Sequence, residues 1–186
     1  MLTIHRVRGI READGVRGNA VVVDGDRVRA VGTYEELAPE LDPRARVREW
    51  DGHLTPGRFE PDAVDLLQAH YWPDPREADE LGAEPLTGPA LRGLDLTDTR
   101  WGHSARRGVQ RLLAHGTTAV AGPFTHPAVR TAVERSPVRV LPAPRPGPLA
   151  PSAPADFAVF AEGTDAGTPG ACLVTVIGGR LVFRRA

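Results

Sequence analysis

Hairpin patterns at both ends of the chain are the strongest constraint on its fold. Near the N-terminus, the β-branched run Asn19–Val23 leads into the turn residues Asp24-Gly25 and a second apolar run. Near the C-terminus, the turn pair Gly178-Gly179 separates the apolar run Cys172–Ile177 from Arg180–Phe183. Asp-Gly and Gly-Gly pairs between apolar runs are a strong signal for antiparallel strands. We therefore predict β-structure at both ends.

The middle of the chain alternates between helical and strand patterns. Apolar residues at helical spacing predict helices over Ser104–Ala114 and His126–Arg135, with Thr125 as the N-cap of the second. The β-branched runs Thr117–Ala121 and Val138–Leu141 predict strands. Strands that alternate with helices in this way are typical of parallel βαβ units.

Segments rich in proline or acidic residues separate these patterns. Pro61–His70 has apolar residues at helical spacing. Trp72–Pro89, rich in Pro, Asp and Glu, is predicted to be a long loop, and the Pro-rich segment Ala143–Pro154 a linker. Trp72 and Trp101 bracket this insertion and are expected to act as lids over the core, with a binding platform as the alternative.

Composition excludes several kinds of chemistry. The 186 residues have a net charge of -1, which gives no electrostatic case for binding nucleic acid or an anionic membrane. Every basic residue among the 23 is arginine, so lysine chemistry is impossible. Cys172 is the single cysteine. The start of the chain does not resemble a signal peptide and no run is long enough to cross a membrane, so we expect a soluble, cytoplasmic protein.

Five short segments, taken together and in order, resemble the amidohydrolase superfamily and its imidazolonepropionase-like members. They are Ala20–Gly32, Leu54–Gly57, Ala114–Thr118, Pro154–Phe160 and Val176–Val182. In that family, strands from both ends of the chain form one composite β-sandwich, and a metal-dependent (β/α)₈ barrel is inserted between them.

The resemblance implies a mixed α/β fold. Residues 1–52 and 152–186 are expected to form the composite β-sandwich. Residues 53–151 are expected to form a three-stranded βαβαβ remnant of a TIM-type barrel. About ninety residues lie between Gly57 and the linker, whereas a complete barrel needs about 250. We therefore expect a truncated barrel.

The resemblance also shows where this chain departs from the family. The family's first barrel strand carries two metal-binding histidines, one residue apart. Asp62 and Val64 stand at those two positions. Aspartate can bind a metal, but valine cannot, and nothing in the chain matches the segments that supply the later ligands. We therefore predict no metal, no cofactor and no hydrolysis by the family mechanism.

Some polar residues are still candidates for a site. The carboxylates Glu60, Asp62 and Asp65 follow the first barrel strand, and His70 lies on the same side of the predicted helix as Asp62 and Asp65. His126 follows the second strand, at the end where barrel sites lie. These five residues are our candidate ligand-binding residues. Each also has a simpler interpretation, because such residues are often solvated helix faces or helix starts.

Two functional hypotheses follow, beside a third interpretation in which the chain is a degenerate gene product with no selected biochemical role. The first is a non-catalytic protein that binds a ligand, acts as a scaffold or supports a true enzyme. Its open barrel fragment would be covered by the segment from Trp72 to Trp101, by a homodimer or by a partner protein. The alternative is an enzyme, or a subunit that completes another active site, using metal-free acid/base chemistry. If a metal were found, hydrolysis of carbon–nitrogen bonds would return as an interpretation.

Overall fold

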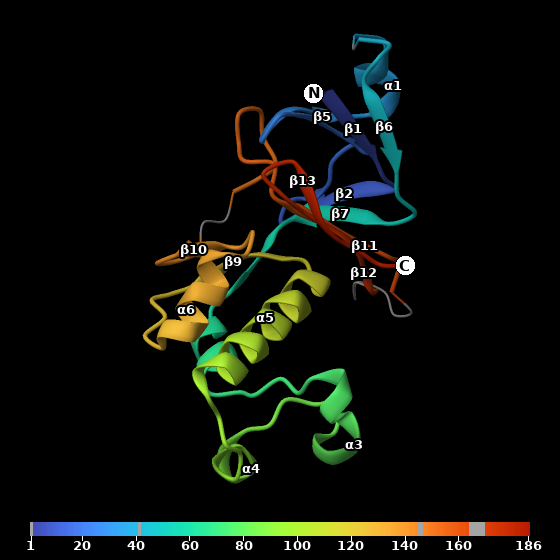
Figure 1. Ribbon diagram of the computed structural model, residues 1–186. Coiled ribbons are helices and arrows are strands. Elements are labelled where there is room, and N and C mark those ends of the chain that lie inside the picture. The colour runs from blue at the N-terminus through green and yellow to red at the C-terminus, as the bar shows by residue number, and fades with distance from the viewer. Residues whose placement is uncertain (1, 41, 145–146, 164–169) are drawn as a thin grey trace. The chain divides into compact units, whose positions relative to one another are not determined.

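The computed structural model describes residues 2–40, 42–144, 147–163 and 170–186, and the chain divides into two compact units (Figure 1). Unit 1 comprises Met1–Arg58, Ala114–Thr118 and Arg145–Ala186. Unit 2 comprises Phe59–Leu113 and Ala119–Pro144. Compared with the proposed sandwich residues 1–52 and 152–186, unit 1 also contains residues 53–58, 145–151 and the short segment 114–118.

The first sheet of unit 1 has four strands in the order β5-β4-β1-β6. They are β1 (Leu2–Arg6), β4 (Ala20–Asp24), β5 (Arg27–Gly32) and β6 (Arg46–Glu49). β1 pairs antiparallel with β4 and parallel with β6. After β5 come α1 (Tyr34–Leu37) and the 3-10 helix η1 (Ala38–Glu40), and a capping box between Thr33 and Glu36 fixes the start of α1.

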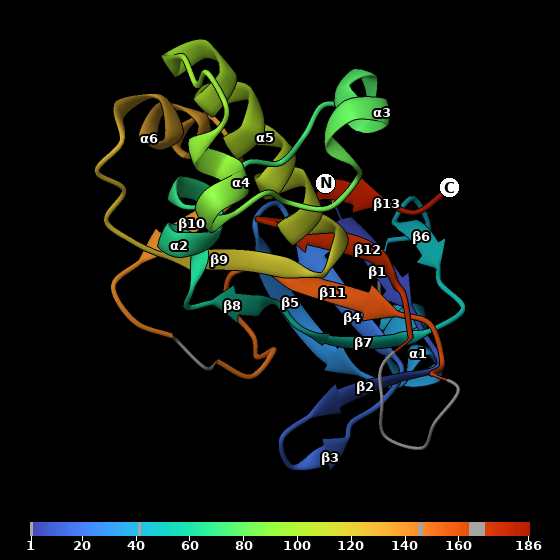
Figure 2. The same ribbon diagram turned by 90° about the horizontal axis from the view of Figure 1, so that it is seen from below.

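The second sheet of unit 1 has six strands in the order β13-β12-β11-β7-β2-β3 (Figure 2). They are β2 (Gly9–Glu12), β3 (Gly15–Val16), β7 (His53–Pro56), β11 (Phe157–Phe160), β12 (Cys172–Ile177) and β13 (Arg180–Arg184). β11 pairs with β7 on one side and with β12 on the other, both antiparallel. The sheet therefore joins segments from both ends of the chain, as predicted.

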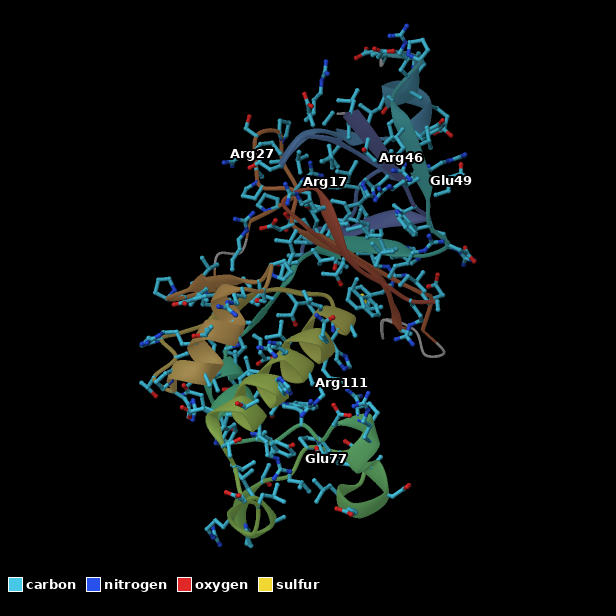
Figure 3. All side chains as sticks on the ribbon, in the orientation of Figure 1. Arg17, Arg27, Arg46, Glu49, Glu77 and Arg111 are labelled. Carbon is cyan, nitrogen blue, oxygen red and sulfur yellow. The ribbon has the colours of Figure 1, made fainter. Side chains whose placement is uncertain are left out.

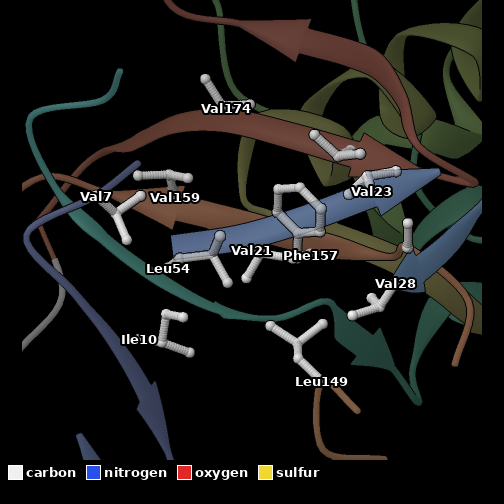
Figure 4. Close-up of a cluster of buried hydrophobic side chains, with 12 residues drawn as sticks. Val7, Ile10, Val21, Val23, Val28, Leu54, Leu149, Phe157, Val159 and Val174 are labelled. Carbon is white, nitrogen blue, oxygen red and sulfur yellow. The ribbon is translucent and has the colours of Figure 1, made fainter. Parts of the chain in front are cut away.

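The sandwich core lies between the two sheets (Figure 4). Val21 and Val23 of the first sheet and Phe157 and Val159 of the second are all at most 2% exposed. Because side chains of a strand alternate between faces, the intervening residues point away from this core. The full set of core residues is Val7, Ile10, Val21, Val23, Val28, Leu54, Leu149, Ala155, Phe157, Val159, Val174 and Val176.

The outer face of β11 is also buried within unit 1. Ala158 and Phe160 point to this face, and they are 0% and 3% exposed. Gly116 packs directly on them with a φ of +81°, and a Cβ added there would lie 2.6 Å from Phe160 Cζ. Only glycine fits this combination of left-handed backbone and close approach. This contact explains the His-Gly-Thr-Thr segment singled out in the sequence.

A third sheet, in the order β10-β9-β8, carries the barrel-like segment. Its strands are β8 (Arg58–Glu60), β9 (Thr117–Ala121) and β10 (Arg139–Leu141), and β9 and β10 pair in parallel. The helices of unit 2 include α2 (Ala63–Gln68), α5 (Asp98–Ala114) and α6 (Pro127–Glu134). The predicted fold class, a mixed α/β protein with a composite β-sandwich and a three-stranded insert, is confirmed.

The prediction of one long loop over Trp72–Pro89 is wrong. This stretch holds the 3-10 helix η2 (Pro75–Glu77) and α3 (Ala78–Leu81), and α4 (Gly88–Arg92) begins at its end. Pro75 and Pro89 occupy the first turns of η2 and α4, where a missing N–H costs nothing, so they start helices instead of breaking them. α5 likewise begins at Asp98, earlier than the predicted Ser104.

Partly buried hydrogen bonds join Tyr71 to Glu77 and attach Trp72 to α2 and α5. Tyr71 is 1% exposed, and its hydroxyl donates to Glu77 Oε2 at 2.7 Å. The Trp72 backbone N–H donates to Ser104 Oγ at 2.8 Å, and the Trp72 indole donates to the Leu66 carbonyl at 3.0 Å. A hydrogen bond from the Asp74 N–H is the main cause that lowers the pKa of Glu77. Trp72 therefore packs on both helices, which agrees with its expected role as a core lid.

His5 is a titratable side chain inside the sandwich. It is 1% exposed, and its Nδ1 accepts a hydrogen bond from the Trp50 indole at 3.1 Å. Its ring meets Phe157 edge-on, with centroids 4.9 Å apart. Nε2 has no hydrogen-bond partner among the residues that the structure describes. Burial, followed by the charge of Arg48, lowers the pKa of His5 to about 4.

We predict that this histidine makes the protein sensitive to mild acid. The unfolded chain binds the proton near pH 6.5 and the folded chain only near pH 4. Stability is therefore complete above pH 6.5 and falls as the pH drops towards 4, by at most about 3 kcal/mol. The measurement is urea unfolding between pH 7.5 and 4.5. His5→Gln, which keeps an acceptor for Trp50, should flatten the slope, and His103→Gln at an exposed position should not. Equal slopes for wild type and His5→Gln would contradict the prediction.

Candidate functional site

The expected metal-binding positions do not lie on a strand. β8 ends at Glu60, and Asp62 is the N-cap residue of α2. Val64 lies in the first turn of that helix. The helical spacing over Pro61–His70 predicted a helix in this segment, and α2 lies there with narrower bounds, Ala63–Gln68. The strand β8 stops two residues before Asp62.

Two candidate carboxylates line an open depression beside α2. The depression has a volume of about 400 Å³ and is formed by Pro61, Asp62, Val64, Asp65, Gln68 and Ala69. Glu60 is not part of its lining. Instead, Glu60 Oε1 accepts a hydrogen bond from the Asp62 N–H at 3.0 Å, which ties the carboxylate to the start of α2.

His70 lies beyond the end of α2 and folds back onto it. Its Nδ1 is 3.1 Å from the Asp65 carbonyl oxygen and 3.5 Å from Asp65 Oδ2. The shorter contact is to the backbone carbonyl, which also accepts the Ala69 N–H at 2.8 Å. The predicted alignment of Asp62, Asp65 and His70 along one helix is wrong, because the helix covers only Ala63–Gln68. Asp65 and His70 are nevertheless brought together.

His126 is the N-cap residue of α6, where Thr125 had been predicted. Its backbone N–H donates to Gln68 Oε1 at 2.7 Å, and its Nε2 is 3.9 Å from Asp98 Oδ1. Its ring centroid is 5.5 Å from that of Trp101. Nδ1 is buried without a hydrogen-bond partner within the described part of the chain. No contact joins the His126 side chain to the four other candidates there.

Gln68 connects the depression to the β9–α6 loop. Its Nε2 donates to Thr125 Oγ1 at 3.3 Å, while its Oε1 accepts the His126 N–H. The same side chain lines the depression. Sequence reasoning missed Gln68, because an isolated glutamine on a short helix belongs to no motif. Its role depends on a tertiary contact across 58 positions.

The side chains present do not suit the family's metal. A catalytic zinc site needs about three protein ligands and a bound water. Among residues 2–40, 42–144, 147–163 and 170–186, no group of three His, Cys, Asp or Glu side chains could hold a metal ion. The one possible ligand at the expected position, Asp62, is exposed and has Val64 where its partner belongs. No catalytic step can therefore be derived through a metal here.

Comparison with solved structures identifies the fold. An adenosine deaminase from Xanthomonas campestris has a TM-score of 0.52 and 16% identity, covering 75% of this chain and 33% of the deaminase. E. coli guanine deaminase has a TM-score of 0.50 and 18% identity, covering 75% and 35%. A. niger ochratoxinase has a TM-score of 0.51 and 17% identity, covering 75% and 30%. The chain thus spans about one third of the length of these enzymes. At such identities the similarity shows the fold alone, which this chain shares with part of each of these enzymes.

A match to a sequence family model makes the resemblance more specific. The model of the bacterial imidazolonepropionase-like composite domain matches residues 20–40, which form β4, β5, α1 and η1. No protein of curated function matches the sequence. The resemblance drawn from the sequence, to imidazolonepropionase-like amidohydrolases, is therefore confirmed. Separately, none of the helices within the described residues is long and apolar enough to span a membrane.

We predict that Gln68 holds the β9–α6 loop in place. Gln68→Ala leaves the His126 N–H without its acceptor and should cost about 1 kcal/mol of stability. The local readout is hydrogen exchange, in which the His126 amide should exchange faster. Gln110→Ala, at an exposed position of α5, is the matched control. Unchanged exchange at His126 in Gln68→Ala would show that the contact has no structural role.

Proposed function

We propose that this protein is a non-catalytic member of the amidohydrolase structural class, in which the sandwich and the short barrel segment serve binding or scaffolding. One observation carries the proposal. The two positions that would hold the first metal-ligand pair are occupied by Asp62 and Val64 and fall at the N-cap and first turn of α2. Residues two apart face the same way on a strand but different ways on a helix. The change is therefore one of backbone geometry as well as of side chains.

The roles of the other candidates support the proposal. Glu60 caps the Asp62 N–H, and His70 binds the Asp65 carbonyl. His126 begins α6 and contributes its backbone N–H to Gln68. These contacts stabilise helix ends and loops.

The length of the insert supports it as well. The insert leaves the sandwich after β7 and returns at β11, and these two strands are hydrogen-bonded neighbours. Both boundaries are therefore internal to the chain. Between them lie the three strands of the barrel-like sheet, whereas barrel active sites draw residues from the ends of several of eight strands.

A binding role requires a surface. Both β10 and β8 are edge strands of the third sheet, and Val140 of β10 is 47% exposed. Exposed edge strands favour pairing with another chain. We therefore keep a homodimer or a partner protein at this sheet as part of the proposal, along with a ligand at the depression lined by Asp62 and Asp65.

The decisive test is metal content together with hydrolysis. We predict that protein purified from zinc- and manganese-supplemented medium contains well under one equivalent of metal by mass spectrometry. It should not deaminate guanine or adenosine under conditions where E. coli guanine deaminase converts guanine. One tightly bound metal per chain, with turnover lost on chelation and restored by metal, would contradict the proposal. Metal-free turnover that is lost in Asp65→Asn or His70→Gln would favour the acid/base alternative.

We also predict that the missing ligands cannot be restored by side chains alone. In Asp62→His/Val64→His, two imidazoles are placed at the start of a helix, where positions two apart do not converge on one ion. Zinc affinity measured by calorimetry should match that of the single variants Asp62→His and Val64→His within about threefold. Much tighter binding by the double variant would show that this segment adopts the family's strand geometry.

A further inference from the structure

An arginine stripe lies on the inner face of the edge strand β6. Arg46 pairs with Thr3 and Arg48 pairs with His5 in the parallel β1–β6 register. Thr3 and His5 in turn lie opposite Val23 and Val21, which belong to the core between the sheets. Because paired residues point to the same face of a sheet, Arg46 and Arg48 face the second sheet. Trp50 continues the stripe and packs against the same core.

A third arginine reaches this place from the second sheet. Arg184 lies on its edge strand β13, opposite the core residue Val174. Its guanidinium is 5.7 Å from the centre of the Trp50 ring. Two edge strands, one from each sheet, therefore bring Arg46, Arg48 and Arg184 to one open side of the sandwich. We call these three residues the edge arginines.

The acidic residues next to the stripe are engaged elsewhere. Glu49 follows Arg48 on β6 (Figure 3) but occupies the opposite face, where it pairs with Arg6 at 3.1 Å. Asp51 pairs with Arg8 at 2.6 Å. Within the residues that the structure describes, no carboxylate forms an ion pair with any edge arginine. Their positive charge is therefore not neutralised by these residues.

This arrangement is electrostatically unfavourable by itself. Like charges held close together repel, and partial burial increases the cost. Burial is the main cause that lowers the pKa of Arg48, and the charges of Arg46 and Arg184 lower it further. An anion placed between the three guanidinium groups would remove the repulsion. Arginine is also the side chain best suited to phosphate and carboxylate, because it can donate two parallel hydrogen bonds.

We propose that the edge arginines form a binding site for a small oxyanion, a phosphate or carboxylate group carried by a soluble ligand. Trp50 provides an apolar wall beside the anion, and its indole is held in place by the hydrogen bond to His5. The site belongs to unit 1 alone and does not depend on the proposed loss of catalysis.

Inward-pointing charges on an edge strand have another known use, which is to prevent edge-to-edge aggregation. That role needs charge but no particular ligand. It predicts that all anions change the melting temperature only through ionic strength. An oxyanion site instead predicts that phosphate or citrate raises the melting temperature more than chloride does at equal ionic strength. The two explanations can therefore be separated by experiment.

The experiment titrates the full chain with inorganic phosphate and, separately, with citrate, against sodium chloride at equal ionic strength. Binding is followed by calorimetry and by thermal unfolding. Either oxyanion should raise the melting temperature of the wild type more than chloride does, and the anion that binds more tightly identifies the ligand chemistry. Arg48→Gln and Arg184→Gln should each weaken binding by about tenfold or more.

Arg29→Gln is the matched control, since it removes an exposed arginine from β5, the other edge strand of the same sheet. It should bind like the wild type. Without added oxyanion, Arg48→Gln should melt no lower than the wild type, because it relieves repulsion; this also shows that the variant folds. Equal effects of chloride, phosphate and citrate on the wild type would overturn the proposal, as would an equal loss of binding in Arg29→Gln.

Discussion

The position of β11 between β7 and β12 is the contact on which this fold depends. Its inward side chains, Phe157 and Val159, fill the core between the sheets, and its outward side chains, Ala158 and Phe160, are covered by the turn at Gly116. A strand buried on both faces and paired on both edges has no free surface. The two ends of the chain must therefore meet before the sandwich has a core. The insert leaves the sandwich after β7 and returns at β11, and these two strands are neighbours in the sheet.

This geometry makes the stability of the sandwich only weakly dependent on the length of the insert. Because β7 and β11 are adjacent, closing the loop between them depends only weakly on how many residues it holds. The turn at Gly116 is the part of the insert that packs within unit 1, and it is retained. Residues that serve only as metal ligands contribute no packing, so the sandwich does not depend on them. The proposed absence of a metal site at Asp62 and Val64, at the start of α2, is therefore compatible with a stable sandwich.

Local sequence patterns predicted many of the strands and helices of this fold, but they did not predict its tertiary contacts. β9 and β12 have their predicted bounds, since β-branched runs next to glycine turns are strong signals. Pro75 and Pro89 were predicted to lie in a loop, because the sequence does not show whether a proline starts or breaks a helix. Among the candidate residues, Asp65 and His70 are close in the sequence and are in contact in the structure. No local sequence pattern pointed to Gln68. The sequence did not reveal the edge arginines either, because the face on which they lie depends on the register of β6 against β1.

The two units differ in how completely their polar groups are satisfied, and this bears on where binding occurs. In unit 2, Glu60, His70 and Gln68 each have a short hydrogen bond to the backbone, although His126 Nδ1 is buried without a partner among the described residues. In unit 1, His5 keeps an unpartnered Nε2 within the described residues, and the edge arginines have no ion pair there. Groups of this kind reduce stability and persist most readily where something outside the fold compensates for them. His5, Arg48 and Trp50 are neighbours, so these unfavourable contributions to stability lie at one side of the sandwich. A ligand that supplies negative charge there offsets the repulsion between the edge arginines.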